Sequence, residues 1–204
     1  MGSKQVKGPI TEEPADRRAA THQRILDAAG RLFRTHGTDG VGLDSVMKEA
    51  GLTHGGFYAH FASKEALVAE VAQTLLQQAA QRWDHVSRTR DRSEALENIV
   101  TSYLDRKHLA STACCPLTTI GPDVARREMS RSAIHDALVG MVQALARCLP
   151  GRRRAKALVT LSTMVGAVVL ARLADDPALA EDVLDAAASS ILGNNTKASL
   201  ASKG

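Results

Sequence analysis

The segment 53–60 combines hydrogen-bonding side chains with two adjacent glycines, a mixture suited to close contact with another molecule. Its polar members are Thr53, His54, Tyr58 and His60. Gly55 and Gly56 would each cost a helix up to about 1 kcal/mol relative to alanine, so a purely structural helix is not expected to contain them in tandem. Without side chains, they let the backbone approach a phosphate or a base edge. The segment therefore predicts a binding surface.

The elements around this segment have the parts of a helix-turn-helix, which spans Gly42 to Phe61. A short helix fits Leu43 to Ala50, Gly51 permits the tight turn, and a second helix fits Thr53 or His54 to His60. Phe57 and Phe61 are four residues apart and are expected to point inward. Such a motif places its second helix in the major groove of DNA. The spacing alone equally allows an ordinary helical hairpin capped by glycines.

The rest of the chain predicts an all-α fold, with a three-helix N-terminal unit and a larger helical bundle, about nine helices in total. Apolar positions repeat at intervals of three and four residues, and no segment has a strand pattern. The other predicted helices run from Arg17 or Thr21 to His36, from a Ser63 cap to about Trp83, from an Asp91–Glu94 capping box to Leu104, from Pro116, from about Ser132 to Pro150, from Arg153 to Leu173, and from an Asp176 cap to Gly193.

The sequence pattern divides the chain into four parts. Residues 1–16 and 194–204 are polar and lack apolar periodicity, so they are expected to be disordered tails. Residues 17–64 form the expected DNA-binding domain, with its motif at 42–61. Residues 65–193 form the expected effector-binding and dimerisation domain.

Composition gives weaker signals. The chain has 204 residues and a net charge of +4, but residues 1–65 carry nine basic and eight acidic groups, a net of only +1. Three cysteines are not expected to form a disulfide framework, and residues 1–16 lack the apolar stretch of a signal peptide. The apolar stretch from Ala157 to Ala171 is shorter than the roughly 20 residues that a bilayer requires. A cytoplasmic protein without a membrane partner is predicted.

The sequence contains no motif that indicates catalysis or cofactor binding. The sequence has no phosphate loop, nucleophile elbow, HExxH or dinucleotide fingerprint, and its histidines lack metal-ligand spacing. We therefore expect no enzyme activity, no cofactor and no metal.

Residues 21–67, THQRILDAAGRLFRTHGTDGVGLDSVMKEAGLTHGGFYAHFASKEAL, resemble the signature of the TetR/AcrR family of transcriptional regulators. The resemblance implies a homodimer that binds a palindromic operator in double-stranded DNA and is released by a small-molecule effector. It assigns phosphate contacts to Thr53, Tyr58, His60 and Lys64, base-facing positions to His54, Gly55 and Gly56, and a backbone contact to Thr21.

Three positions depart from the family pattern. Gly42 replaces a Ser or Thr cap, His22 replaces a common Arg, and Ala59 replaces a frequent aromatic residue. His54 is then the only bulky side chain expected on the base-facing edge. Asp44 or Lys48 of the preceding helix would supply any further contact.

The larger domain is expected to hold the effector in an aliphatic-rich pocket with few aromatic side chains. Its candidate residues are Tyr103, His108, Cys115, Leu117, Met141 and Met164. Each also fits plain core. The last two helices carry Gly166, Ala167, Ala187 and Ala188, small residues that allow close helix contact, and are the predicted dimer interface.

Cys115 supports an alternative trigger. If Pro116 is the first residue of a helix, Cys115 lies at its N-terminus, where the helix dipole favours the reactive thiolate. The chain would then be a repressor that senses electrophiles or oxidants. A buried, inert cysteine and a strained Cys114–Cys115 disulfide remain open as well.

Overall fold

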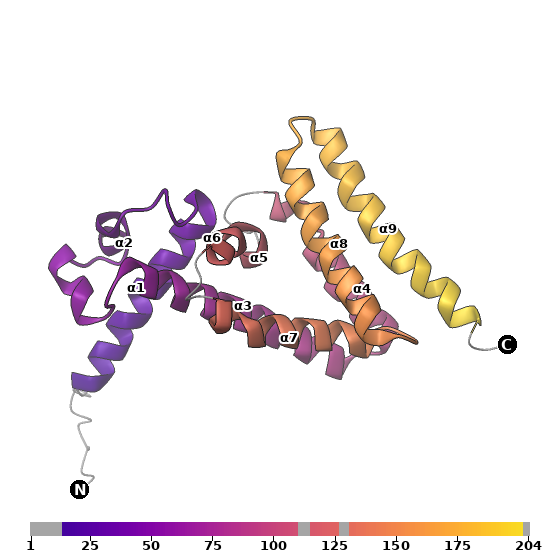
Figure 1. Cartoon of the computed structure of the whole chain (residues 1–204), viewed down its shortest axis with the longest axis horizontal. Coiled ribbons are helices and arrows are strands. Elements are labelled where there is room, and N and C mark those ends of the chain that lie inside the picture. Colours follow the sequence, from indigo (N-terminus) through magenta and orange to yellow (C-terminus); the bar gives the residue numbers. More distant parts are fainter. Residues whose placement is uncertain (1–13, 110–114, 127–130, 202–204) are drawn as a thin grey trace, which may run out of the picture.

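The computed structural model describes residues 14–109, 115–126 and 131–201, and within these ranges the regular elements are helices (Figure 1). This confirms the all-α prediction. Both predicted tails lie partly outside the described residues, as does Cys114. Side chains are described from residue 15 to residue 193, except at 110–114 and 127–133.

The N-terminal unit consists of α1 (Pro14–His36), α2 (Leu43–Glu49) and η1 (His54–Ala59). Together they lie at one end of the molecule, opposite the hairpin of the last two helices (Figure 1). Phe33 and Phe57 are completely buried at its centre. Gly37 and Gly51 have positive φ angles of 71° and 67°, which an L side chain rarely adopts, so glycine is required at both turns.

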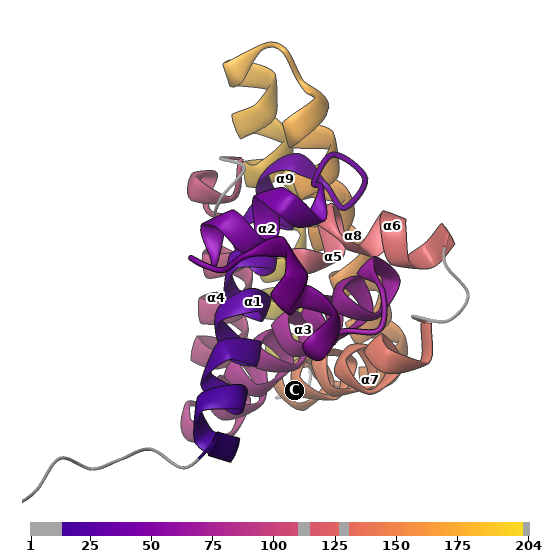
Figure 2. The same ribbon diagram turned by 90° about the vertical axis from the view of Figure 1, so that its left-hand side faces the viewer.

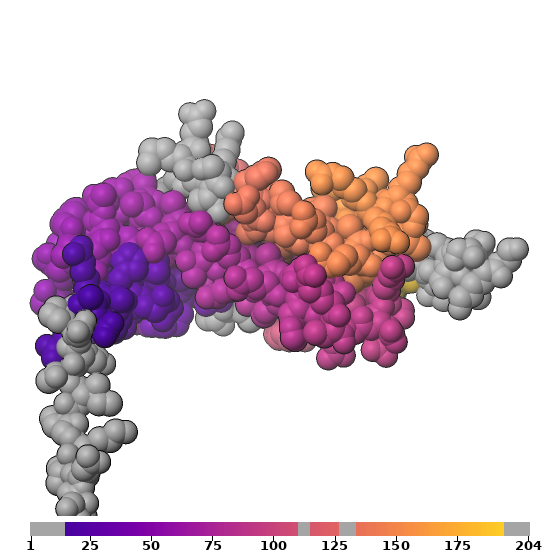
Figure 3. Space-filling model, turned by 90° about the horizontal axis from the view of Figure 1, so that it is seen from below, coloured from indigo at the N-terminus to yellow at the C-terminus, as the bar shows by residue number. Residues whose placement is uncertain are grey.

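One long helix, α3 (Lys64–Thr89), runs from this unit into the larger domain (Figures 1 and 3). Ser63 caps it as predicted, because its hydroxyl accepts a hydrogen bond from the Ala66 amide at 3.2 Å. The helix continues six residues beyond the expected end at Trp83, and in this extension Asp84 and Ser87 bind its neighbour α7 (Arg131–Cys148).

The remaining helices of the larger domain pack against α3, against α7 or against one another (Figure 2). They are α4 (Arg92–Tyr103), η2 (Arg106–His108), α5 (Pro116–Thr119), α6 (Gly121–Arg126), α7 (Arg131–Cys148), α8 (Arg153–Leu173) and α9 (Pro177–Ala201). The antiparallel pair of α8 and α9 lies at the end distant from the N-terminal unit (Figure 1). α8 is long and apolar enough to cross a membrane by length and composition, but it packs against α7 and α9 within the chain.

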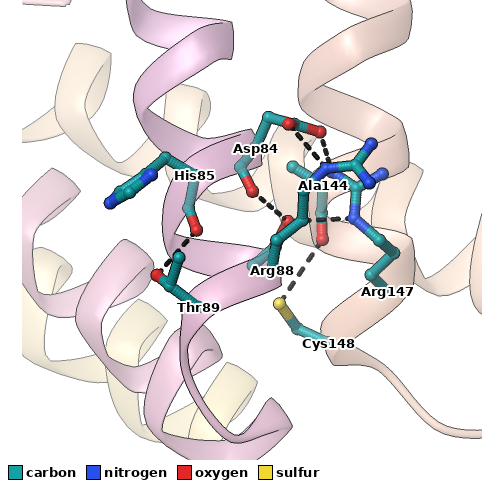
Figure 4. Close-up of polar contacts among 8 residues, drawn as sticks. Asp84, His85, Arg88, Thr89, Ala144, Arg147 and Cys148 are labelled. Atoms are coloured by element: carbon teal, nitrogen blue, oxygen red, sulfur yellow. Dashed lines mark hydrogen bonds and ion pairs between the residues drawn. The ribbon is translucent and has the colours of Figure 1, made fainter.

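Polar contacts fasten α3 to α7 near the end of α3 (Figure 4). The Asp84 carboxylate binds Arg147 of α7 and also accepts a hydrogen bond from Nε of Arg88 at 2.7 Å. Arg147 donates from Nε to the Ser87 hydroxyl at 2.9 Å. The arginine partners, Arg88 first, hold the pKa of the Asp84 carboxyl below its usual range. Nearby, burial raises the pKa of the Cys148 thiol, which favours an inert protonated sulfur.

Two local predictions are wrong. α9 continues to Ala201, so residues 194–201 are helical rather than a tail; Gly193 does not end the helix because it lacks the positive φ of a helix-terminating glycine. Asp91 precedes α4, but its side chain makes no capping hydrogen bond. The helix predicted from Pro116 does begin there, but it has only four residues and is followed by the separate α6.

Candidate nucleic-acid interface

The second helix of the motif is a 3₁₀ helix, and its position is fixed from both sides. Its inner face carries Phe57, which stacks on Phe61 at a centroid distance of 5.6 Å. Two arginines of α1 also hold the backbone: Arg18 donates to the Ala59 carbonyl at 2.8 Å, and Arg24 donates to the Ala50 carbonyl at 2.6 Å. The surface is therefore positioned by α1 as well as by the turn. Sequence reasoning missed both arginines, because each acts on a carbonyl distant in the sequence.

The outer face of η1 is open to solvent. Thr53, His54 and Gly55 are exposed, and Tyr58 has 65% of its surface accessible. The Tyr58 and His54 rings meet edge to face at 6.4 Å. A large aromatic side chain left outside the core, beside a hydrogen-bonding ring, indicates a contact surface.

The two glycines differ in what surrounds them. A Cβ at Gly55 would meet nothing within 4 Å, whereas a Cβ at Gly56 would lie 3.7 Å from Cε of the buried Met47. Gly55 therefore faces open space in front of η1. Gly56 faces α2. The structure therefore gives less support for the predicted base-facing position of Gly56 than for that of Gly55.

His54 is not a free side chain. Its Nδ1 lies 2.5 Å from Oδ1 of Asp44, an exposed residue in the first turn of α2. This contact fixes the orientation of the imidazole at the edge of the surface. Asp44 thus contributes by orienting His54, a role that differs from the direct contact considered from sequence.

His60 is less accessible than its neighbours. Its Nδ1 is buried and has no hydrogen-bond partner among the described residues. Burial first, and then the nearby His22 and Arg18, lower the pKa of His60. The structure therefore favours a neutral imidazole here, which can donate a hydrogen bond but carries no charge toward a phosphate.

His22 has a structural role in place of the common Arg. Its ring stacks on Phe61 at 4.4 Å, and its Nε2 lies 2.6 Å from Oε1 of Glu70 on α3. These contacts join α1, the end of the motif and α3.

The other predicted contact residues lie around η1. Lys48 is exposed on α2, Lys64 is half-buried at the first position of α3, and Thr21 is half-buried on α1. The helix-turn-helix thus combines an exposed polar face, a glycine open to solvent and a cation on each neighbouring helix. These groups can donate hydrogen bonds to phosphates and reach base edges.

In the larger domain, the structure brings together four of the six predicted pocket residues. Tyr103, His108, Cys115 and Met141 line one cavity of about 390 Å³. Leu117 and Met164 are not among its lining residues. The apolar part of the lining is largely aliphatic and includes Leu75, Val86 and Ile99. Trp83 of α3 also lines the cavity, and it contacts Tyr103 at a centroid distance of 5.7 Å.

Comparisons with known proteins agree on the N-terminal domain. Residues 25–71 match the model of the bacterial regulatory proteins, tetR family. The HTH-type transcriptional regulator AcrR of Shigella flexneri is 43% identical over 51 residues, which cover 25% of this chain and 24% of that protein. The match thus spans about a quarter of this curated relative.

Solved structures extend the likeness to the fold of the whole chain. The reduced form of NemR from E. coli superposes with a TM-score of 0.73 at 20% identity, covering 84% of this chain and 95% of that one. RolR in complex with resorcinol gives a TM-score of 0.56 at 18% identity, covering 89% and 90%. At this identity, both show the fold alone.

Proposed function

The chain belongs to the TetR/AcrR family of helix-turn-helix transcriptional regulators, which are not enzymes, and from this premise we propose that it is a dimeric repressor released from a palindromic operator by a small-molecule effector. The exposed face of η1 carries the proposal. There, Gly55 is open to solvent between the side chains of His54 and Tyr58, and Lys48 and Lys64 lie on the neighbouring helices.

In this proposal, different residues of the surface contact the phosphates and the bases. Lys64, Thr53 and Tyr58 bind phosphates, which fix the register of the protein on the duplex. His54, oriented by Asp44, reads a base edge beside the backbone of Gly55. The neutral His60 supports the phosphate contacts as a hydrogen-bond donor.

Dimerisation uses the outer face of α8 and α9. Val159, Leu170 and Leu173 fall on one side of α8 and are 66%, 59% and 74% exposed, and Leu179 on α9 is half exposed. Such a stripe is costly in water and supports an interface. Ala167 and Ala187, predicted to contact the partner, are instead buried within the chain. Larger side chains therefore form the proposed interface.

Release of the protein from DNA is proposed to depend on the cavity that the larger domain forms with the end of α1. The cavity of about 390 Å³ supports a drug-sized ligand. RolR, which has the same fold, is described in complex with resorcinol, and this supports a small organic effector here. The protein is proposed to act in the cytoplasm, where its DNA lies.

The alternative trigger, modification of Cys115, has weaker support. Cys115 is buried and precedes a helix of only four residues, whose dipole is correspondingly small. It does line the cavity, so an electrophilic ligand would reach it there. Release of DNA by an electrophile that persists in Cys115→Ser would eliminate this alternative.

A binding assay on the DNA flanking the protein's own gene tests the proposal. Fluorescence anisotropy should show saturable binding to that DNA in preference to a scrambled duplex of the same composition, and a panel of small molecules should contain one that reverses it. Sedimentation should give a dimer at micromolar concentration, and Leu173→Glu should give a monomer. Equal affinity for the scrambled duplex, or a monomeric wild type, would refute the proposal.

A further inference from the structure

The cavity in the larger domain is strongly biased in charge. Its lining includes the cationic residues Arg34, Arg82 and Lys107, and its described lining contains no aspartate or glutamate. Lys107 is paired with Asp105 at 3.0 Å. Arg34 and Arg82 have no ion pair among the described residues. A cavity with two uncompensated guanidinium groups favours an anion.

Arg34 can offer donors to a ligand. Its Nε donates to the Gly30 carbonyl of the same helix at 3.0 Å, and this contact leaves the two terminal amino groups of the guanidinium available. A guanidinium binds a carboxylate through parallel hydrogen bonds, which makes arginine the most suitable partner for this group.

Aromatic rings line the same cavity. Trp83 meets Tyr103 edge to face, and the Tyr103 ring stacks on His108 at a centroid distance of 6.0 Å and an interplanar angle of 23°. Nδ1 of His108 is buried and has no hydrogen-bond partner among the described residues. A buried nitrogen without a partner is costly, so a ligand that binds it is stabilised. Flat rings in the wall of a cavity favour a planar ligand that can pack against them.

We propose that this cavity binds a small aromatic carboxylate, whose anionic group binds Arg34 and Arg82 and whose ring packs against Trp83 and Tyr103. The inference deepens the proposed function, on which it rests for the role of this ligand as the effector. Binding itself does not depend on that role.

The position of Arg34 gives the ligand a direct effect on the DNA-binding domain. Arg34 lies in the last turn of α1, the helix whose Arg18 binds the Ala59 carbonyl at the end of η1 and whose Arg24 binds the Ala50 carbonyl at the end of α2. The other two cations that line the cavity belong to the larger domain, on α3 and η2. A carboxylate between Arg34 and Arg82 therefore joins the end of α1 to the C-terminal half of α3, and its binding favours those relative positions of the two helices in which both arginines reach it.

Fluorescence of Trp83 tests binding directly, because Trp83 is the single tryptophan of the chain and lines the cavity. The full chain is titrated with benzoate, benzamide and benzylamine, which are anionic, neutral and cationic versions of one ring. Excitation at a wavelength that these probes do not absorb avoids interference. Benzoate should give a saturable change at least about tenfold tighter than benzamide, and benzylamine should give none.

Charge variants assign the binding residues. Arg34→Gln and Arg82→Gln should each weaken benzoate at least about tenfold and leave benzamide unchanged, whereas the exposed Arg90→Gln, outside the cavity, should leave both unchanged. Arg82 is exposed, so its variant keeps the test valid if Arg34→Gln fails to fold. Equal affinity for benzamide, a preference for benzylamine, or no saturable change with any probe would overturn the proposal.

A parallel DNA assay separates the two proposals. If benzoate binds with the expected charge preference but no ligand releases DNA, the effector role fails and the carboxylate site stands. If the flanking DNA is bound and released by a different class of ligand while benzoate does not bind, the carboxylate site fails and the regulator stands.

Discussion

Thr38 and Asp123 join the two domains across 85 positions of sequence: the amide and the hydroxyl of Thr38 both donate to Oδ2 of Asp123, at 3.0 and 2.5 Å. Thr38 lies in the loop between α1 and α2, and Asp123 lies in the first turn of α6. Both residues are buried, and Asp123 also accepts a hydrogen bond from Arg126 at 2.5 Å. A displacement of α6 would therefore pull on the loop that leads into the helix-turn-helix.

Thr38→Val should destabilise the protein. It removes the hydroxyl donor from a buried carboxylate, and a hydrogen bond to a charged group contributes about 1.5–3 kcal/mol to the free energy of unfolding. Urea denaturation measures the loss. The control is Thr35→Val, whose hydroxyl donates only to the Arg31 carbonyl of its own helix and should cost less than about 0.5 kcal/mol. Equal stability of the two variants would show that the bond between domains contributes little.

Gly55→Ala should make the protein more stable and its DNA binding weaker. The backbone there has no positive φ and the new methyl meets nothing, so the substitution should raise the free energy of unfolding by about 0.4–1 kcal/mol. The methyl would, however, occupy the space in front of η1, and affinity for the flanking DNA should fall about tenfold, or about 1.4 kcal/mol.

Gly56→Ala is the matched control for this prediction. Its methyl would contact Met47 of α2 rather than the outer face, so it should stabilise the protein with little effect on DNA affinity. If both variants bind DNA as the wild type does, the backbone of η1 does not approach the duplex closely.

Lys64→Ala should weaken DNA binding to a similar degree on all sequences. A lysine that neutralises one phosphate contributes about one unit to the slope of log affinity against log salt concentration, so the slope should become shallower by about one. Anisotropy titrations at several salt concentrations measure it, with Lys156→Ala of α8 as the control. A slope unchanged by Lys64→Ala would remove this residue from the phosphate contacts.

Stability should fall as the pH is lowered below about 6.5, in part through His60. Its pKa is lowered in the folded state, so between the ordinary value and the folded value the unfolded chain binds more protons. The stabilisation is complete above the ordinary pKa and is lost as the pH falls toward the folded value. The surrounding charged groups are His22, which pairs with Glu70, and Arg18.

Thermal melts between pH 8 and 5.5 measure this effect by comparing the wild type with His60→Gln. The variant should lose less stability over this range. His108, whose pKa is also lowered by burial, is present in both proteins and cancels in the comparison. An equal loss in both proteins would mean that His60 titrates alike when folded and unfolded.

Sequence predicted the features that depend on neighbouring residues. The turn at Gly51 and the caps at Ser63 and Asp176 follow from local backbone chemistry, and the structure confirms each of them. Asp91 occupies the predicted cap position, but its side chain makes no capping hydrogen bond. Sequence spacing allows such a bond but does not determine the rotamer that makes it.

Features that depend on distant residues were not predictable. The Asp44 contact fixes His54, the carbonyl of Ala59 binds Arg18, and Arg34 of α1 reaches the same cavity as Trp83 of α3. Each pair is brought together only by the packing of helices, which no sequence interval encodes. The place of Trp83 has the same origin, because the sequence indicated only that it lies near the end of a helix, and the packing of α3 makes it part of the cavity wall.

Hydroxyl-radical footprinting on the DNA that flanks the protein's own gene tests the central claim most directly. A dimer that presents two copies of η1 should protect two half-sites related by dyad symmetry, with centres about 34–36 Å, one helical turn, apart or a multiple of it. His54→Ala should weaken both half-sites equally and relax the preference at one base pair in each. A single asymmetric footprint, or no protection beyond that on scrambled DNA, would contradict the account.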